Sequence, residues 1–116
     1  MKSSSVLAAC LLLASSVVAV AASSAGAVEA RQAPSCGEWI SHREKSDTLA
    51  IGNTSWLLGY LSGIAVSRGT DFLSGTDNNS LYRWMDNYCR SNPLRDVSAG
   101  GNALAAELTK AKGAPK

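Results

Sequence analysis

The sequence is poor in the side chains from which catalytic and metal sites are built. It contains a single histidine, His42, and three cysteines, with no C-x-x-C pair. Structural zinc sites are normally built from closely spaced cysteine and histidine pairs, so the lack of a C-x-x-C pair and the single histidine leave metal binding without support. His42 stands among the charged residues 43–45, without a free nucleophile beside it that it could activate. We therefore expect a protein that is not an enzyme and holds no metal or other cofactor.

The sequence also lacks any cluster of one charge. Its 11 basic and 9 acidic residues give a formal net charge of +2. They are scattered singly, as on an ordinary solvated surface, with no basic run and no alternation of basic and aromatic residues. A nucleic-acid-binding surface normally shows a concentrated basic patch. We expect no nucleic acid among the partners.

The first residues have the layout of a secretory signal peptide. Lys2 precedes an apolar run at 6–22, and small residues follow it. Two small-x-small patterns place cleavage between about residues 21 and 27. A membrane anchor is the weaker interpretation, because serines interrupt the run. Cys10 as a lipidated first residue is also disfavoured, because apolar residues continue directly after it. We expect residues 1–27 to be removed and the protein to reside in the periplasm, outside the membrane.

The exported part of the chain is small and keeps two cysteines, Cys36 and Cys89. Removing 27 of the 116 residues leaves 89, which is enough for one domain. In an exported protein, two cysteines most simply form one disulfide. On the chain-entropy account, closing a loop of this size contributes roughly 4 kcal/mol. We expect a flexible arm at 28–34, a helical domain at 35–112 and a frayed tail at 113–116.

The longest apolar stretch of the exported part is WLLGYLSGIAV, at 56–66. It is shorter than the roughly 20 residues that span a bilayer. Trp56, Tyr60 and Ile64 recur at helical spacing, and the stretch is apolar on nearly every side, which is typical of a buried helix. We predict a central helix at 54–68. Gly59 and Gly63 lie four residues apart, where they would let a neighbouring backbone approach.

Three further helices are predicted from their caps and apolar stripes. Ser35 and Glu38 form a capping box for a helix at 36–46. A break at 47–53 separates it from the central helix. A helix at 80–91 is capped by Asn79 or Asp77, and its apolar stripe comprises Leu81, Trp84, Met85 and Tyr88.

The last helix is predicted to start at Asn92 as cap and Pro93 as first helical residue. Its apolar face comprises Leu94, Val97, Gly101, Leu104, Leu108 and Ala111, and Gly100 and Gly101 weaken its middle. The predicted fold class is all-α, a small bundle of about four helices around a buried central helix, joined by one disulfide.

The longest polar segment of the domain lies at 70–79. Phe72 and Leu73 should turn its first half inward, and residues 75–79 should form an exposed loop. Asp71 and Asp77 flank the loop as a conceivable acid/base pair. Turn formation and helix capping account for both carboxylates more simply.

Four motifs occur in a fixed order. They are Cys36-x-x-Trp39, WLLGYLSG at 56–63, WMDNYC at 84–89 and Asn-Pro-Leu at 92–94. Together they resemble the small periplasmic immunity proteins of the type VI secretion amidase system, the Tai type. More distantly, they are similar to the periplasmic acid-stress chaperones of the HdeA type. The resemblance covers residues 36–110, and its most specific parts are LLGYLSG and WMDNYC.

The resemblance implies a helical protein with a Cys36–Cys89 disulfide and no catalytic activity. It implies binding to a peptidoglycan-cleaving amidase, often as a homodimer, with a loop between helices blocking the active-site cleft of the enzyme. The matched positions are core and cysteine positions, so no inhibitory contact is carried over. The candidate partner-binding residues here are those of the polar loop: Asp71, Gly75, Thr76, Asp77, Asn78 and Asn79. The alternative is an HdeA-like chaperone activated at low pH.

Overall fold

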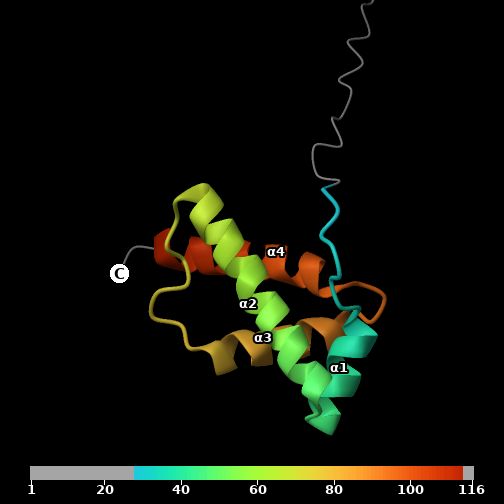
Figure 1. Cartoon of the computed structure of the whole chain (residues 1–116). Helices are drawn as coiled ribbons and strands as arrows, with labels where there is room; N and C mark the ends of the chain where they lie inside the picture. The colour runs from blue at the N-terminus through green and yellow to red at the C-terminus, as the bar shows by residue number, and fades with distance from the viewer. Residues whose placement is uncertain (1–27, 114–116) are drawn as a thin grey trace, which may run out of the picture.

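The computed structural model describes residues 28–113, and the predicted signal peptide lies outside them. The described chain forms four α-helices (Figure 1). They are α1 (Cys36–Lys45), α2 (Thr48–Arg68), α3 (Asn78–Ser91) and α4 (Val97–Gly113). Within this part of the chain the one extended pairing is an isolated bridge between Ser35 and Asp96. The predicted all-α bundle of four helices is confirmed.

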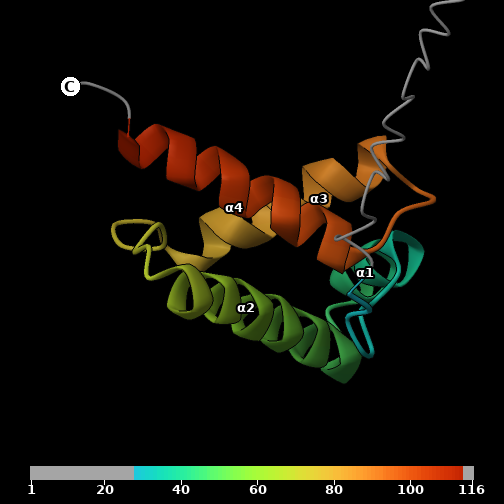
Figure 2. The same cartoon turned by 90° about the horizontal axis from the view of Figure 1, so that it is seen from above.

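The helices pack as a ring rather than around a central member. α1 and α4 each pack mainly against α2 and α3. α2 runs along the outside of this arrangement, as Figures 1 and 2 show from two directions. Ala50, Leu57 and Leu61 are its buried residues, and only 17% of its most apolar window is buried. The prediction that this helix is a buried centre is therefore wrong: the bundle covers one side of it, and even the apolar Ile51 and Val66 are exposed.

The core is filled from all four helices and from the segment between α2 and α3. Trp39 of α1, Met85 of α3 and Phe72 of the connecting segment are completely buried. Cys36 and Cys89 form a disulfide that joins the start of α1 to the end of α3, and both are 1% exposed. The predicted bridge is confirmed, and it is part of the core.

The predicted break at 47–53 is also wrong. α1 ends at Ser46, whose φ is +51°, and α2 begins directly after Asp47. The Asp47 side chain accepts a hydrogen bond from the Ala50 amide at 3.1 Å, which satisfies an amide of the first turn. Gly52 lies inside α2 and does not interrupt it, because the helix begins upstream at the cap residue Asp47.

The predicted start of α4, with Asn92 as cap and Pro93 as first helical residue, is also wrong, and here the helix starts later than predicted. Residues 92–96 form a turn, and α4 begins at Val97. Asp96 acts as the cap, accepting from the Ala99 amide at 2.9 Å and from the Ser98 hydroxyl. The Val97 amide donates to Pro34 O at 2.9 Å, so the arm before α1 fixes this start. Leu94 lies in the turn and is 98% exposed, which removes it from the predicted apolar face.

The glycines that allow close packing lie on α4. A Cβ at Gly59 or Gly63 would meet nothing within 4 Å, so the predicted helix contact at these two glycines is absent. A Cβ at Gly100 would lie 2.8 Å from Tyr88 Cδ1, and one at Gly101 would lie 2.8 Å from Tyr60 Cδ1. Both α4 glycines are buried, and they allow α4 to lie directly against these rings.

Candidate binding surfaces

The polar segment between α2 and α3 is a tightly held turn. Phe72 is completely buried and fixes its first half. The Asp71 carboxylate accepts from the Ser74 amide at 3.3 Å, and the Lys112 ammonium of α4 donates to Ser74 O. Gly75 adopts φ +81°, a conformation that favours glycine, and it is exposed. The segment thus projects a defined backbone at one end of the bundle (Figure 1).

The remaining predicted partner-binding residues continue this turn into α3. Asp77 caps α3, accepting from the Ser80 amide and the Ser80 hydroxyl, both at 2.9 Å. The hydrogen bond from the Ser80 amide is the main cause that lowers the pKa of the Asp77 carboxyl. Thr76 is half-buried, whereas Asn78 and Asn79 belong to the first turn of α3 and are exposed. Asp77 thus has the capping role that the sequence suggested.

A second surface is the α2 outer face, which we define as Gly52, Ser55, Gly59, Gly63 and Val66. All five residues are exposed, and Val66 is 82% exposed. No residue of α2 before its last position is charged. A solvent-facing helix surface in a globular protein normally carries charged and polar residues. An exposed, uncharged face of this length is a candidate contact surface.

By length and composition, α2 is the one described helix that meets the usual criteria for crossing a membrane. Its 21 residues exceed the 11-residue stretch that stands out in the sequence. Leu57 and Leu61 on its inner side are completely buried in the core. One side of α2 therefore packs against the other helices of the bundle.

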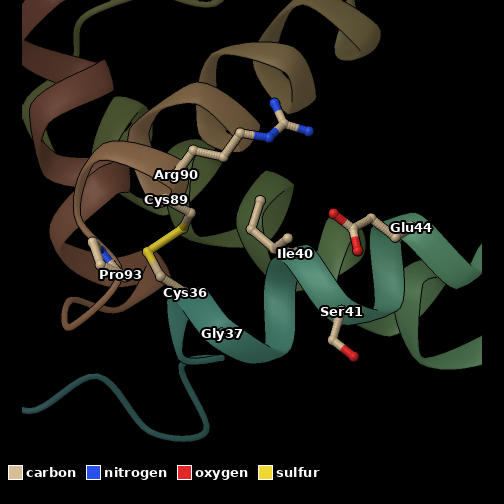
Figure 3. Close-up of a pocket in the computed structure, with 8 residues that line it drawn as sticks. All are labelled: Cys36, Gly37, Ile40, Ser41, Glu44, Cys89, Arg90 and Pro93. Carbon is tan, nitrogen blue, oxygen red and sulfur yellow. A yellow bond between two sulfur atoms is a disulfide. The ribbon is translucent and has the colours of Figure 1, made fainter.

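A third surface is a groove over the disulfide, between α1 and the end of α3, with a volume of about 390 Å³. Figure 3 shows its lining residues. We call it the disulfide groove, and it is lined by Cys36, Gly37, Ile40, Ser41, Glu44, Cys89, Arg90 and Pro93. Its floor is apolar, and it carries one acidic and one basic side chain. Its volume falls within the range of pockets that hold small ligands or peptide side chains.

Besides the disulfide, a partly buried ion pair between Arg43 and Asp86 links α1 to α3. The Asp86 carboxylate accepts from Trp39 Nε1 at 2.7 Å and from Arg43 Nε at 3.0 Å and Nη2 at 2.9 Å. The Arg43 guanidinium also lies over the rings of Trp39 and Tyr82, at 5.9 and 5.6 Å from their centroids. Burial raises the pKa of Asp86, but the hydrogen bonds from Arg43 and Trp39 outweigh it, and the net pKa is lowered.

Sequence reasoning missed this pair, although a signal was present. Asp86 falls beside Met85 on the apolar side of α3, where an isolated carboxylate would be costly to bury. Arg43 lies one turn after Trp39 on the matching side of α1. A carboxylate on one buried stripe and a guanidinium on another form a detectable pattern.

His42 has a structural partner. Its Nδ1 lies 2.7 Å from the Asp47 carboxylate, the group that caps α2. The hydrogen bond with His42 is the largest cause that lowers the pKa of Asp47. Among residues 28–113, no group of three or more His, Cys, Asp or Glu side chains is arranged to hold a metal ion.

Comparisons with known proteins found no match. No protein-family model, no curated protein and no solved structure matches it.

Proposed function

We propose that the protein is an exported, non-catalytic binding protein of the periplasm that inhibits a peptidoglycan-cleaving amidase. The resemblance in the four motifs supports this proposal, and the all-α fold with a Cys36–Cys89 disulfide agrees with what that resemblance implies. The partner is a protein, and inhibition occurs by occlusion of its cleft. The chain contributes no reacting group.

The observation that carries the proposal is the shape of the turn at 70–77. An inhibitory loop binds more tightly if it is already held in its bound conformation, because less entropy is lost on binding. Here the buried Phe72, the Asp71 turn and the contact from Lys112 hold the backbone. Gly75, at the exposed tip, presents backbone without a side chain and suits a narrow cleft.

The test is inhibition of an amidase encoded beside the gene for this protein. Purified protein is added to that enzyme, and release of peptides from peptidoglycan is measured. Asn79→Arg places a bulky charge beside the turn and should weaken inhibition at least tenfold. Asn87→Arg makes the same replacement at an exposed position of the same helix and should leave inhibition unchanged. Absence of inhibition by the unmodified protein rejects the proposal.

We also propose that the protein forms a homodimer through the α2 outer face. Two copies of an uncharged surface bring no like charges together, and the open positions at Gly59 and Gly63 allow the helices to approach closely. Val66 supplies an exposed apolar side chain for the contact. Sedimentation measurements over a range of concentrations test this proposal directly.

An acid-activated chaperone of the HdeA type is the second candidate, and one observation favours it. Every helix start depends on a carboxylate whose pKa is lowered: Glu38 in α1, Asp47 in α2, Asp77 in α3 and Asp96 before α4. Protonation of all four at low pH removes these caps together, and loosening of the helices would then expose the core.

Two measurements test the chaperone function. Circular dichroism between pH 7 and about pH 2 should show loss of tertiary structure, and the acidified protein should keep a denatured client protein soluble. A fold that stays rigid throughout this range eliminates the chaperone.

A further inference from the structure

We propose that the disulfide groove binds an extended peptide segment of another protein, in which an apolar residue stands between an acidic and a basic one. The groove lies at α1, whereas the turn at 70–77 lies at the other end of the bundle (Figure 1). This binding site is separate from the proposed inhibitory loop, and its existence does not depend on that function.

The floor of the groove is apolar and can accommodate an apolar side chain. Ile40 and Pro93 supply its accessible apolar surface, next to the Cys36–Cys89 disulfide, whose two cysteines are almost completely buried. The space exists because Gly37 has no side chain: a Cβ there would meet only Ser35 Oγ, at 3.9 Å. A leucine-sized group placed over this floor would cover apolar surface that is otherwise in contact with water.

The rim supplies one charge of each sign. Arg90 follows Cys89 directly on α3, and its side chain runs from the disulfide end toward the side of the groove where Glu44 stands on α1 (Figure 3). Neither Arg90 nor Glu44 takes part in an ion pair among residues 28–113. Asp86, one turn before Arg90, is already bound by Arg43. Both rim charges are therefore free to pair with a ligand.

The length of the groove determines the length of the ligand. The wall formed by α1 runs from Gly37 to Glu44, which is about 10 Å of helix. Three residues of extended peptide cover about 10 Å, at about 3.3 Å each. Side chains alternate along an extended chain, so the central one points to one side and its two neighbours to the other. When the apolar side chain lies on the floor, its two neighbours point to the solvent side of the groove, where the exposed side chains of Arg90 and Glu44 can pair with a carboxylate and an ammonium.

The experiment uses a synthetic probe, acetyl-Asp-Leu-Lys-amide, titrated into the ¹⁵N-labelled protein with its disulfide intact. Amide chemical shifts of Gly37, Ser41 and Arg90 should move and saturate, with a dissociation constant in the millimolar range. The uncharged analogue acetyl-Asn-Leu-Gln-amide should bind roughly tenfold more weakly, because it lacks both exposed ion pairs.

Two variants and a control locate the binding. Gly37→Leu fills the groove and should abolish the shifts, whereas Gly113→Leu adds the same side chain to an open glycine at the end of α4 and should leave them intact. Arg90→Gln, which alters only an exposed side chain, should weaken binding several-fold and covers the case in which Gly37→Leu fails to fold. Lack of saturating shifts, shifts confined to α2 or to the turn at 70–77, or equal binding of the uncharged peptide would each overturn the proposal.

Discussion

Replacing Gly101 by alanine should destabilise the protein, whereas the same change at Gly63 should stabilise it. In an exposed helix interior, glycine costs about 1 kcal/mol relative to alanine, because alanine loses less backbone freedom on folding. Gly63 has nothing within 4 Å of the position of its Cβ, so Gly63→Ala should gain about this amount. Both glycines lie within helices, and that gain is common to the two variants.

The contact that opposes the gain at Gly101 is with the Tyr60 ring. A new Cβ would lie 2.8 Å from Cδ1 and 3.1 Å from Cε1, against about 3.5–4.0 Å for carbon atoms in good contact. The ring has little room to move: it stacks on Trp56 at 4.9 Å, and its hydroxyl donates to Asn102 Oδ1 at 3.0 Å. Overpacking of this kind costs about 1–3 kcal/mol. The free energies of unfolding of the two variants should therefore differ by about 1–3 kcal/mol.

Urea unfolding followed by circular dichroism, with the disulfide intact, measures both variants against the unmodified protein. A double-mutant cycle with Tyr60→Leu isolates the contact, since removal of the ring should abolish most of the penalty at Gly101. If Gly101→Ala stabilises the protein as much as Gly63→Ala does, α4 is not held against Tyr60 as described. The packing argument is then refuted.

Three further predictions address the core and the surface. The pKa of Asp86 is lowered in the folded protein, so the stability that its ionised carboxylate contributes is complete above the unfolded pKa near 4 and is lost as the pH falls through the lower folded pKa. Asp86→Asn should therefore lower the free energy of unfolding by about 2 kcal/mol at pH 7. In a plot of unfolding free energy against pH, this variant should also show a smaller decrease on the acid side. Joint replacement of Cys36 and Cys89 by alanine should lower the free energy of unfolding by about 2–5 kcal/mol, and thermal melting with and without reductant checks this effect. Gly59→Arg should convert the proposed dimer to monomer in sedimentation equilibrium while leaving the circular dichroism spectrum unchanged; a dimer that persists would place the interface elsewhere.

Features of the fold that depend on neighbours in sequence could be predicted. The capping box of Ser35 and Glu38 is present with both of its hydrogen bonds, and Asp77 was one of the two predicted caps for α3. The disulfide could be predicted from the even number of cysteines that remain if the chain is exported, as its first residues predict. The two caps could be predicted from residues at most a few positions apart in the sequence, and the disulfide from the number of cysteines.

Features that depend on tertiary neighbours could not be predicted in this way. Asp47 and Asn53 are both good caps, and nothing local decides between them; the hydrogen bond to His42 and the packing of α2 on α1 favour the earlier start. A glycine pair looks the same in sequence whether a ring or solvent faces it. For this reason the packing role was assigned to Gly59 and Gly63 instead of to the α4 glycines.

The candidate sites divide in a similar way. The polar turn at 70–79 was visible in the sequence because it is long and lacks apolar periodicity. The disulfide groove was not visible, since Gly37 and Arg90 lie 53 positions apart and meet only through the bridge between their neighbours Cys36 and Cys89. Residues of this kind can be connected from sequence only if the disulfide is first used as a distance restraint.

The exposure of α2 has a physical explanation that also bears on its partners. The two sides of the helix differ more in side-chain size than in polarity: Leu57 and Leu61 point into the core, whereas the outer face consists mainly of small residues and carries Val66 as its one large apolar side chain. Hydrophobic stabilisation scales with the apolar area removed from water, and glycine has almost no such area to remove. Leaving this face in water therefore costs little, although its hydropathy resembles that of a membrane span. For the same reason the face offers little apolar area to a lipid, and its advantage lies in close approach of a second backbone.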